Sequence, residues 1–150
     1  MTRVAVGGTF EPLHDGHKAL LKKAYELGKN GEVIIGLTSN ELARQRAREV
    51  LDYTERFNNL KKYIIQKFGV QPKIIKLHNR YGTTLTEDFD YIVVSPETYP
   101  VAQQINKIRI KNNLKPINIV KIDYVLAKNG KPISSTRIKN KEIDIHGKLI

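Results

Sequence analysis

The stretch RVAVGGTFEPLHDGH, residues 3–17, decides the fold. Its first four residues are typical of a short buried parallel strand, and the glycine-containing loop at residues 7–12 predicts that the strand ends there. From His14 onward the apolar residues recur every three to four positions, as on one face of an amphipathic helix. They are Ala19, Leu20, Leu21, Ala24 and Leu27. The stretch therefore predicts a strand, a glycine turn and a helix.

This unit has a chemical consequence at the start of the helix. Unpaired N–H groups and the positive end of the helix dipole favour a phosphate there, and Gly7 and Gly8 let the backbone approach a ligand closely. His14 and His17 are three residues apart, which places both imidazoles on one helix face. Gly16 lies between them and costs about 1 kcal/mol relative to alanine in a helix interior. We therefore expect a bulky group to need the space beside Gly16.

Neither the glycines nor the histidines identify a site alone. The glycine pair is compatible with an ordinary turn, and the histidine pair with a surface or core position. Two histidines at this spacing also suit a metal, but the chain has no cysteine, and Glu11 and Asp15 are the only carboxylates nearby. We therefore expect no metal site built by the protein.

Composition limits the class of protein. A chain of 150 residues fits one domain, residues 1–150, and the absence of cysteine excludes disulfides and thiolate catalysis. The formal net charge of +11 suits polyanionic ligands such as nucleotides, phosphorylated metabolites or nucleic acid. No apolar run approaches the roughly 18 residues that a membrane span requires, and no targeting segment is recognisable. We expect a cytoplasmic protein.

The rest of the chain alternates strands and helices. We expect further strands at residues 32–38, 72–77, 90–95 and 116–122. Helices are expected from about 52 to 68, with Phe57, Leu60, Ile64 and Ile65 turned inward, and from about 96 to 108. Residues 28–31 suit a left-handed cap of the first helix. The pattern predicts an α/β fold, a Rossmann-like doubly wound five-stranded parallel sheet with helices on both faces.

A short basic helical piece at residues 40–48 follows the second strand. Ligands bind beyond the carboxyl ends of strands in such sheets, so Arg44, Arg46 and Arg48 are candidates to meet a phosphate. A solvated helix face is the alternative interpretation.

Residues 133–138, ISSTRI, carry three hydroxyls followed by an arginine. Hydroxyls cap free helix N–H groups and arginine binds two oxygens of a phosphate at once, so the segment suits a phosphate-binding helix start. Alone, it is typical of an ordinary helix cap.

Together the two segments carry a resemblance. Residues 7–17 resemble the HxGH motif of the nucleotidyltransferase superfamily, although Glu11 stands where that motif has aspartate, and residues 133–138 resemble its ISSTRI motif. The short opening and residues 92–98, IVVSPET, resemble the archaeal and eukaryotic phosphopantetheine adenylyltransferases. The resemblance implies the HxGH nucleotidyltransferase fold, and a monomer that transfers AMP from ATP to 4′-phosphopantetheine in coenzyme A biosynthesis, with Mg²⁺ carried by ATP.

The resemblance also implies residue roles. His17 and His14, together with Arg137, are the expected catalytic residues; His17 would donate to the α-phosphate, and His14 would bind the triphosphate. ATP would contact Gly7, Gly8, Thr9, Phe10, His14, His17, Ser134, Ser135, Thr136 and Arg137. The incoming phosphate would contact Thr9, Thr38 and Arg44. We therefore expect the amino-terminal turn and the late Ser-Ser-Thr-Arg segment to converge on one triphosphate.

Two alternatives remain open. A related small nucleotidyltransferase acting on FMN, nicotinamide mononucleotide or glycerol 3-phosphate would share the fold and the nucleotide site. A basic nucleic-acid-binding domain is compatible with the charge, but the aromatic residues are few and scattered, and no motif of that class is present. Class I aminoacyl-tRNA synthetases share the histidine motif, but 150 residues leave no room for tRNA recognition.

Overall fold

The alternating strands and helices build one sheet, in a computed structural model that describes residues 1–45 and 49–150. The strands are β1 (Arg3–Gly8), β2 (Glu32–Thr38), β3 (Lys73–Leu77), β4 (Tyr91–Val94) and β5 (Asn118–Lys121). Their order across the sheet is β3-β2-β1-β4-β5, and every neighbouring pair is parallel. The predicted five-stranded parallel sheet is confirmed.

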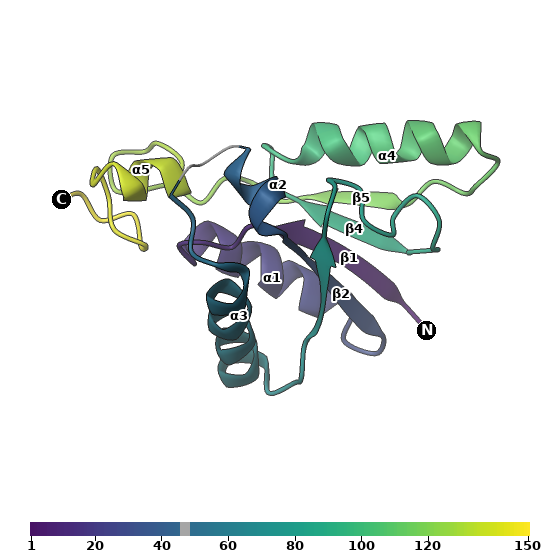
Figure 1. The fold of residues 1–150 in the computed structure, drawn as a ribbon, viewed down its shortest axis with the longest axis horizontal. Coiled ribbons are helices and arrows are strands. Elements are labelled where there is room, and N and C mark those ends of the chain that lie inside the picture. Colours follow the sequence, from purple (N-terminus) through teal and green to yellow (C-terminus); the bar gives the residue numbers. More distant parts are fainter. Residues whose placement is uncertain (46–48) are drawn as a thin grey trace.

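Helices cover both faces of this sheet, as the sequence predicts. They are α1 (Asp15–Leu27), α2 (Asn40–Arg44), α3 (Tyr53–Phe68), α4 (Tyr99–Lys111) and α5 (Ser135–Lys139). Figure 1 shows α4 along one face, with α1 and α3 on the other. α4 packs against β4 and β5, and α2 packs against β2. On the α4 side, therefore, α4 covers the β4 and β5 half of the sheet.

Alternate strand residues divide the core between the two faces. Val4 and Val6 of β1 pack with Leu21 of α1 and Leu60 of α3. Ala5, which lies between them, faces α4. It belongs to a second cluster of buried residues, made of Ala5, Phe89, Ile92, Val94, Ala102, Ile105 and Ile117. The two-residue period of the strands thus builds one core on each side of β1.

Three local predictions are wrong. β1 continues through Gly7 and Gly8, because these residues pair in register with the residues at the end of β2. Gly28, which caps α1, has φ −93°, so the cap is not left-handed. Ile65 is 36% exposed, because the inner face of α3 runs through Arg56, Leu60 and Ile64 instead.

In Figure 1, β1, β4 and β5 run toward the left side of the molecule, where α5 and the chain's carboxyl terminus lie. Within the described residues, no helix combines the length and the apolar character that crossing a bilayer requires.

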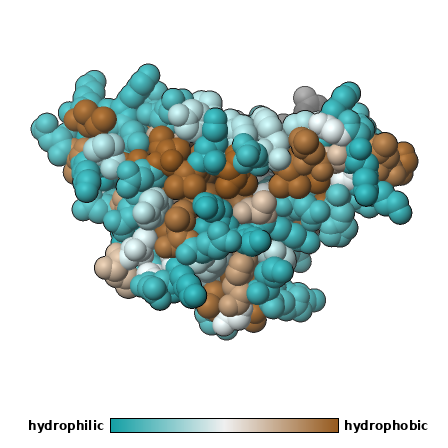
Figure 2. Space-filling view, turned by 180° about the vertical axis from the view of Figure 1, so that it is seen from behind, coloured by the Kyte–Doolittle hydropathy of each residue, from teal (hydrophilic) through white to brown (hydrophobic). Residues whose placement is uncertain are grey.

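Seen from behind, hydrophilic side chains dominate the surface, and apolar ones gather in a band across the middle of that face (Figure 2).

Candidate active site

A cavity of about 420 Å³ lies at the carboxyl ends of the strands. Residues of the amino-terminal turn line it, and so do residues at the start of α5. From the first segment come Gly7, Gly8, Thr9, His14 and His17, and from the second Ser134, Ser135 and Thr136. The two segments, more than a hundred residues apart in sequence, therefore meet at one cavity, as the sequence predicts.

The two histidines form the cap of α1. His14 is the N-cap residue, and its Nδ1 accepts the backbone N–H groups of Gly16 at 3.0 Å and His17 at 3.3 Å. In return, Nδ1 of His17 accepts the backbone N–H of His14 at 3.3 Å. The two rings stack, with centroids 3.7 Å apart. Because both Nδ1 atoms accept hydrogen bonds, each neutral ring carries its proton on Nε2.

Burial keeps these rings neutral. It lowers the pKa of His14 to about 4, although Asp15 opposes the shift. Burial and then the neighbouring His14 lower the pKa of His17 to about 3, opposed by the Pro12 carbonyl. At neutral pH both histidines are therefore uncharged donors rather than cations.

Gly16 and Phe10 pack against the two histidine rings. A Cβ at Gly16 would lie 2.8 Å from Cε1 of His14, so the bulky group that the sequence led us to expect is this imidazole. Phe10 is only 2% exposed, and its ring centroid lies 5.2 Å from that of His17. Phe10 thus supports His17 from behind.

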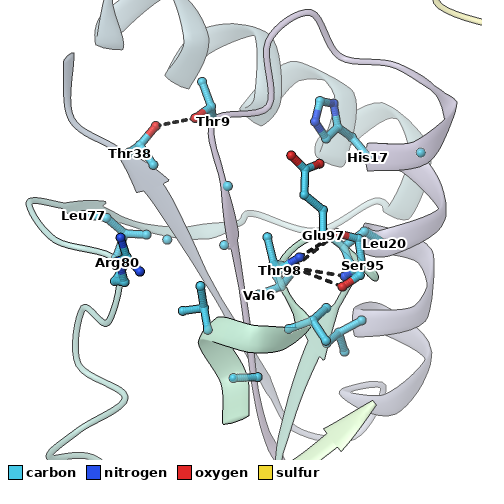
Figure 3. A pocket seen from close by; sticks show the side chains of 18 of the residues that line it. Val6, Thr9, His17, Leu20, Thr38, Leu77, Arg80, Ser95, Glu97 and Thr98 are labelled. Atoms are coloured by element: carbon cyan, nitrogen blue, oxygen red, sulfur yellow. Dashed lines mark hydrogen bonds between the residues drawn. The ribbon is translucent and has the colours of Figure 1, made fainter. Parts of the chain in front are cut away.

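Two threonines, Thr9 after β1 and Thr38 at the end of β2, lie side by side in the wall of the same cavity. The hydroxyls of Thr9 and Thr38 are 2.9 Å apart, and the buried Arg56 donates to Thr38 Oγ1 at 3.1 Å. Figure 3 shows the threonine pair on one side, and His17 with Glu97 on the other. Hydrogen-bond donors therefore lie on two sides of the space between them.

The α5 segment is held by caps and charges. Ser134 is the N-cap, and its Oγ accepts the backbone N–H of Arg137 at 3.2 Å. The guanidinium of Arg137 donates to the Pro132 carbonyl at 2.8 Å. Lys139 lines the cavity, and its Nζ lies 2.6 Å from a carboxylate oxygen of Glu11. An ion pair thus joins α5 to the amino-terminal turn.

Not every residue of the predicted site reaches the cavity. Thr38 lines it with the residues named above, whereas Phe10, Arg44 and Arg137 do not. Arg46 and Arg48 lie outside the described residues. Residues 1–45 and 49–150 contain no group of three His, Cys, Asp or Glu side chains that would hold a metal ion.

Sequence reasoning missed several residues at this cavity. Lys139 lines the cavity but belongs to a helix, where a lone basic residue is normally solvated. Arg56 does not line the cavity, but it contacts Thr38, which does. Arg80, Glu97 and Asp123 lie in connections after β3, β4 and β5 and also line the cavity. Their place after a strand was the available signal, because ligands of such sheets bind there.

The far part of the cavity is apolar. Its wall is formed by alternate residues of β1 to β4 on the face toward α4, together with residues of α4 itself. They include Ala5, Ile34, Ile75, Leu77, Ile92, Val94, Ala102 and Ile105. The cavity thus joins a polar end, rich in N–H and O–H donors, to an apolar end.

Known proteins are similar to this chain in sequence and in fold. The family model described as cytidylyltransferase-like matches residues 5–141. A phosphopantetheine adenylyltransferase of Archaeoglobus fulgidus is 51% identical over 148 residues, which cover 99% of each chain. Another protein of that name, from Methanosarcina mazei, is 51% identical over 152 residues, covering 99% of this chain and 97% of its own.

A solved structure agrees with the sequence matches. It is the crystal structure of an Archaeoglobus fulgidus protein described as having unknown function, which is 49% identical to this chain. The match covers 81% of this chain and 90% of that one, with a TM-score of 0.78. The chain belongs to the cytidylyltransferase-like family of nucleotidyltransferases, together with the archaeal phosphopantetheine adenylyltransferases.

Proposed function

We propose that this protein transfers AMP from ATP to 4′-phosphopantetheine, producing dephospho-coenzyme A and pyrophosphate. One observation carries the proposal: both motif segments line a single cavity that has a polar and an apolar end. The polar end suits a triphosphate, and the apolar end suits the long arm of this acceptor. Archaeal relatives with this name are about half identical to the chain over nearly its full length.

The reaction needs positioning rather than a protein base. A phosphate monoester has its second pKa near 6, so the acceptor is already ionised at neutral pH. One of its oxygens bonds to the α-phosphorus of ATP while the bond to pyrophosphate breaks. The protein's task is to hold two anions in line and stabilise the charge that grows on the transferred phosphate.

The neutral histidines suit this task. Each keeps its Nδ1 as an acceptor of a backbone N–H and presents the other nitrogen as a donor. His17 would donate to the α-phosphate in the transition state, and His14 to the triphosphate. Gly7 and Gly8 would let the protein backbone approach the nucleotide closely. Because the rings are fixed by the helix cap, they need little reorganisation when charge develops.

The start of α5 would bind the outer phosphates. Ser134, Ser135 and Thr136 bring hydroxyls and backbone N–H groups to the cavity, and Lys139 adds a cation. Arg137 donates to the Pro132 carbonyl and forms an ion pair with Glu142, so its contribution to ATP binding runs through this segment. Mg²⁺ fits the same arrangement as a companion of ATP, since it is readily held by substrate phosphates and water.

The acceptor would enter from the threonine side. Thr9 and Thr38 would bind its phosphate, and the arm would lie against the apolar wall near Ile75 and Leu77. FMN, nicotinamide mononucleotide and glycerol 3-phosphate offer no comparable flexible arm. We further propose that the chain is one domain and acts as a monomer in the cytoplasm.

The decisive experiment measures pyrophosphate release from ATP and Mg²⁺ with a panel of acceptors. We expect release with 4′-phosphopantetheine and dephospho-coenzyme A as the co-product. Pantetheine without its phosphate is the matched control and should give none. Faster release with FMN, nicotinamide mononucleotide or glycerol 3-phosphate would overturn the choice of acceptor.

A further inference from the structure

Arg56 of α3 is a charged residue at a core position. It is 0% exposed, and it shares the inner face of α3 with Leu60 and Ile64, four and eight residues further along the helix. Burying a guanidinium is unfavourable unless its N–H groups are hydrogen-bonded, and an apolar residue would serve packing alone at least as well. The position therefore calls for an explanation beyond packing.

The partners of Arg56 come from the loops that end β1 and β2 and from the entry to α3. Nε donates to the Leu51 carbonyl at 2.8 Å, and Nη2 donates to Asn40 Oδ1 at 3.1 Å. Nη1 donates to Thr38 Oγ1 at 3.1 Å and to the Thr9 carbonyl at 3.5 Å. Each of these acceptors is a neutral group. Because none of these four acceptors is a carboxylate, they hold the guanidinium between the two threonines without neutralising its positive charge.

An arginine sets the direction of the hydrogen bonds around it. Its guanidinium has five donors and no acceptor, so Thr38 Oγ1 must accept from Arg56. The hydroxyls of Thr38 and Thr9 lie 2.9 Å apart. An anion in the cavity favours the arrangement in which Thr38 donates to Thr9 and Thr9 donates to the anion. All three O–H and N–H bonds then point the same way.

The charge of Arg56 acts along the same line. Burial lowers its pKa, and Glu11 and Asp52 oppose that shift. Arginine ordinarily titrates above about 12, so the group stays cationic at neutral pH. A positive charge held behind two cavity hydroxyls, where water is excluded, attracts an anion more strongly than a solvated lysine at the rim would.

We propose that Arg56 is a positioning residue for the phosphate of the acceptor. It touches no substrate; it orients the Thr9 and Thr38 hydroxyls and holds a positive charge behind them. The inference rests on the proposed function, because that function supplies the phosphate that the Thr9 hydroxyl would meet. It predicts that a substitution of Arg56 weakens binding of the acceptor phosphate more than binding of ATP.

The chain offers a matched control in Arg109 of α4. Arg109 is 1% exposed, and it likewise donates to backbone carbonyls, those of Thr84, Glu87 and Lys115. It also pairs with Asp88 at 3.1 Å. Its bonds to Thr84, Glu87 and Asp88 lie in the connection between β3 and β4 and involve neither Thr9 nor Thr38. Arg109→Lys therefore disturbs a buried arginine of the same kind without touching the Thr9 and Thr38 pair.

The experiment measures binding of 4′-phosphopantetheine, pantetheine and ATP by titration calorimetry, with KM for acceptor and ATP alongside. Thr38→Val cuts the link while leaving Arg56 in place, so it is informative even if Arg56→Lys folds poorly. We expect both variants to lower the affinity for 4′-phosphopantetheine about tenfold, the loss typical of a hydrogen bond to a charged group. ATP and pantetheine should bind as in wild type, and Thr38→Ser should recover most of the lost affinity.

The control and the double variant separate positioning from stability. Arg109→Lys should lower the Tm and leave all three affinities unchanged. Combining Arg56→Lys with Thr38→Val should lower the affinity for the acceptor little further, because both changes break the same series of hydrogen bonds. Equal weakening of ATP, pantetheine and 4′-phosphopantetheine, or none, would overturn the inference. A wild-type protein that fails to bind 4′-phosphopantetheine at all would instead refute the proposed function.

Discussion

The two segments that meet at the cavity are held in different ways. β1 is the central strand of the sheet, and the turn after it is anchored by Phe10, which is 2% exposed, and by the paired histidine cap. α5 has five residues, none of them buried. It depends on the Ser134 cap and on the ion pair between Lys139 and Glu11. One segment belongs to the core, and the other is attached to it.

The difference matches the chemistry proposed for each segment. Transition-state donors must be fixed within a fraction of an ångström, which a central strand and a capped helix provide. The outer phosphates need only be gripped and released, and a short helix with few buried contacts opens at small free-energy cost. The carboxyl-terminal segment is attached to the start of α1, since the Asp15 backbone N–H donates to the Ile145 carbonyl and His146 lies 2.9 Å from the Asp15 carboxylate.

The largest effect is expected from His17→Ala in the rigid segment. It removes a donor proposed to act on the transferred phosphate, and one such donor typically contributes about 10²- to 10³-fold to kcat. Steady-state kinetics with 4′-phosphopantetheine would measure the loss, with circular dichroism to confirm the native fold. His78→Ala, at an exposed histidine after β3, is the control and should leave kcat unchanged. A native His17→Ala protein with wild-type kcat would contradict the role.

A second prediction concerns pH and stability. Folding lowers the pKa of His14 to about 4 and that of His17 to about 3, so below about pH 6.5 the unfolded chain binds protons that the folded chain does not. Both histidines therefore favour the folded state at neutral pH, and this contribution is lost as the pH falls toward 4. His14→Asn keeps an N-cap acceptor and removes one titration.

Urea unfolding at pH 7, 6 and 5 would test this prediction. Between pH 7 and 5 we expect wild type to lose about 1–2 kcal/mol more of its free energy of unfolding than His14→Asn does. Other titrating groups contribute to both proteins and cancel in the comparison. Equal losses would mean that His14 is not held neutral by the fold.

The contrast between the segments also explains what the sequence could predict. The strands and helices α1 and α3 follow from hydrophobic periodicity and from glycine signals, which are local, whereas the meeting of the two motifs follows from the resemblance to a known family. The continuation of β1 through Gly7 and Gly8 depends on pairing with β2, which no local signal records. The cap at Gly28 depends on packing in the same way, because a Cβ there would lie 2.6 Å from a methyl of Val33.

The positions of the buried and paired charged residues do not follow from local sequence patterns. Arg56 occupies a core position that periodicity assigns to apolar side chains, whereas Ile65, which periodicity places inward, is 36% exposed. Lys139 belongs to a basic stretch, and only the approach of Glu11 from the other end of the chain brings it to the cavity. Arg137, predicted beside the phosphates, is bonded to its own loop. Long-range partners decide these positions, and a single sequence does not contain them.

The smallest effect is expected from Ser134→Ala in the attached segment. It removes the cap of α5, which typically costs about 1 kcal/mol, and because the helix is not part of the core this should appear as weaker ATP binding rather than global unfolding. We expect KM for ATP to rise about fivefold, with Tm within a few degrees of wild type. Ser134→Thr keeps a hydroxyl at the N-cap and should restore the affinity. A large loss of Tm with unchanged KM would show instead that α5 is as much a part of the core as β1.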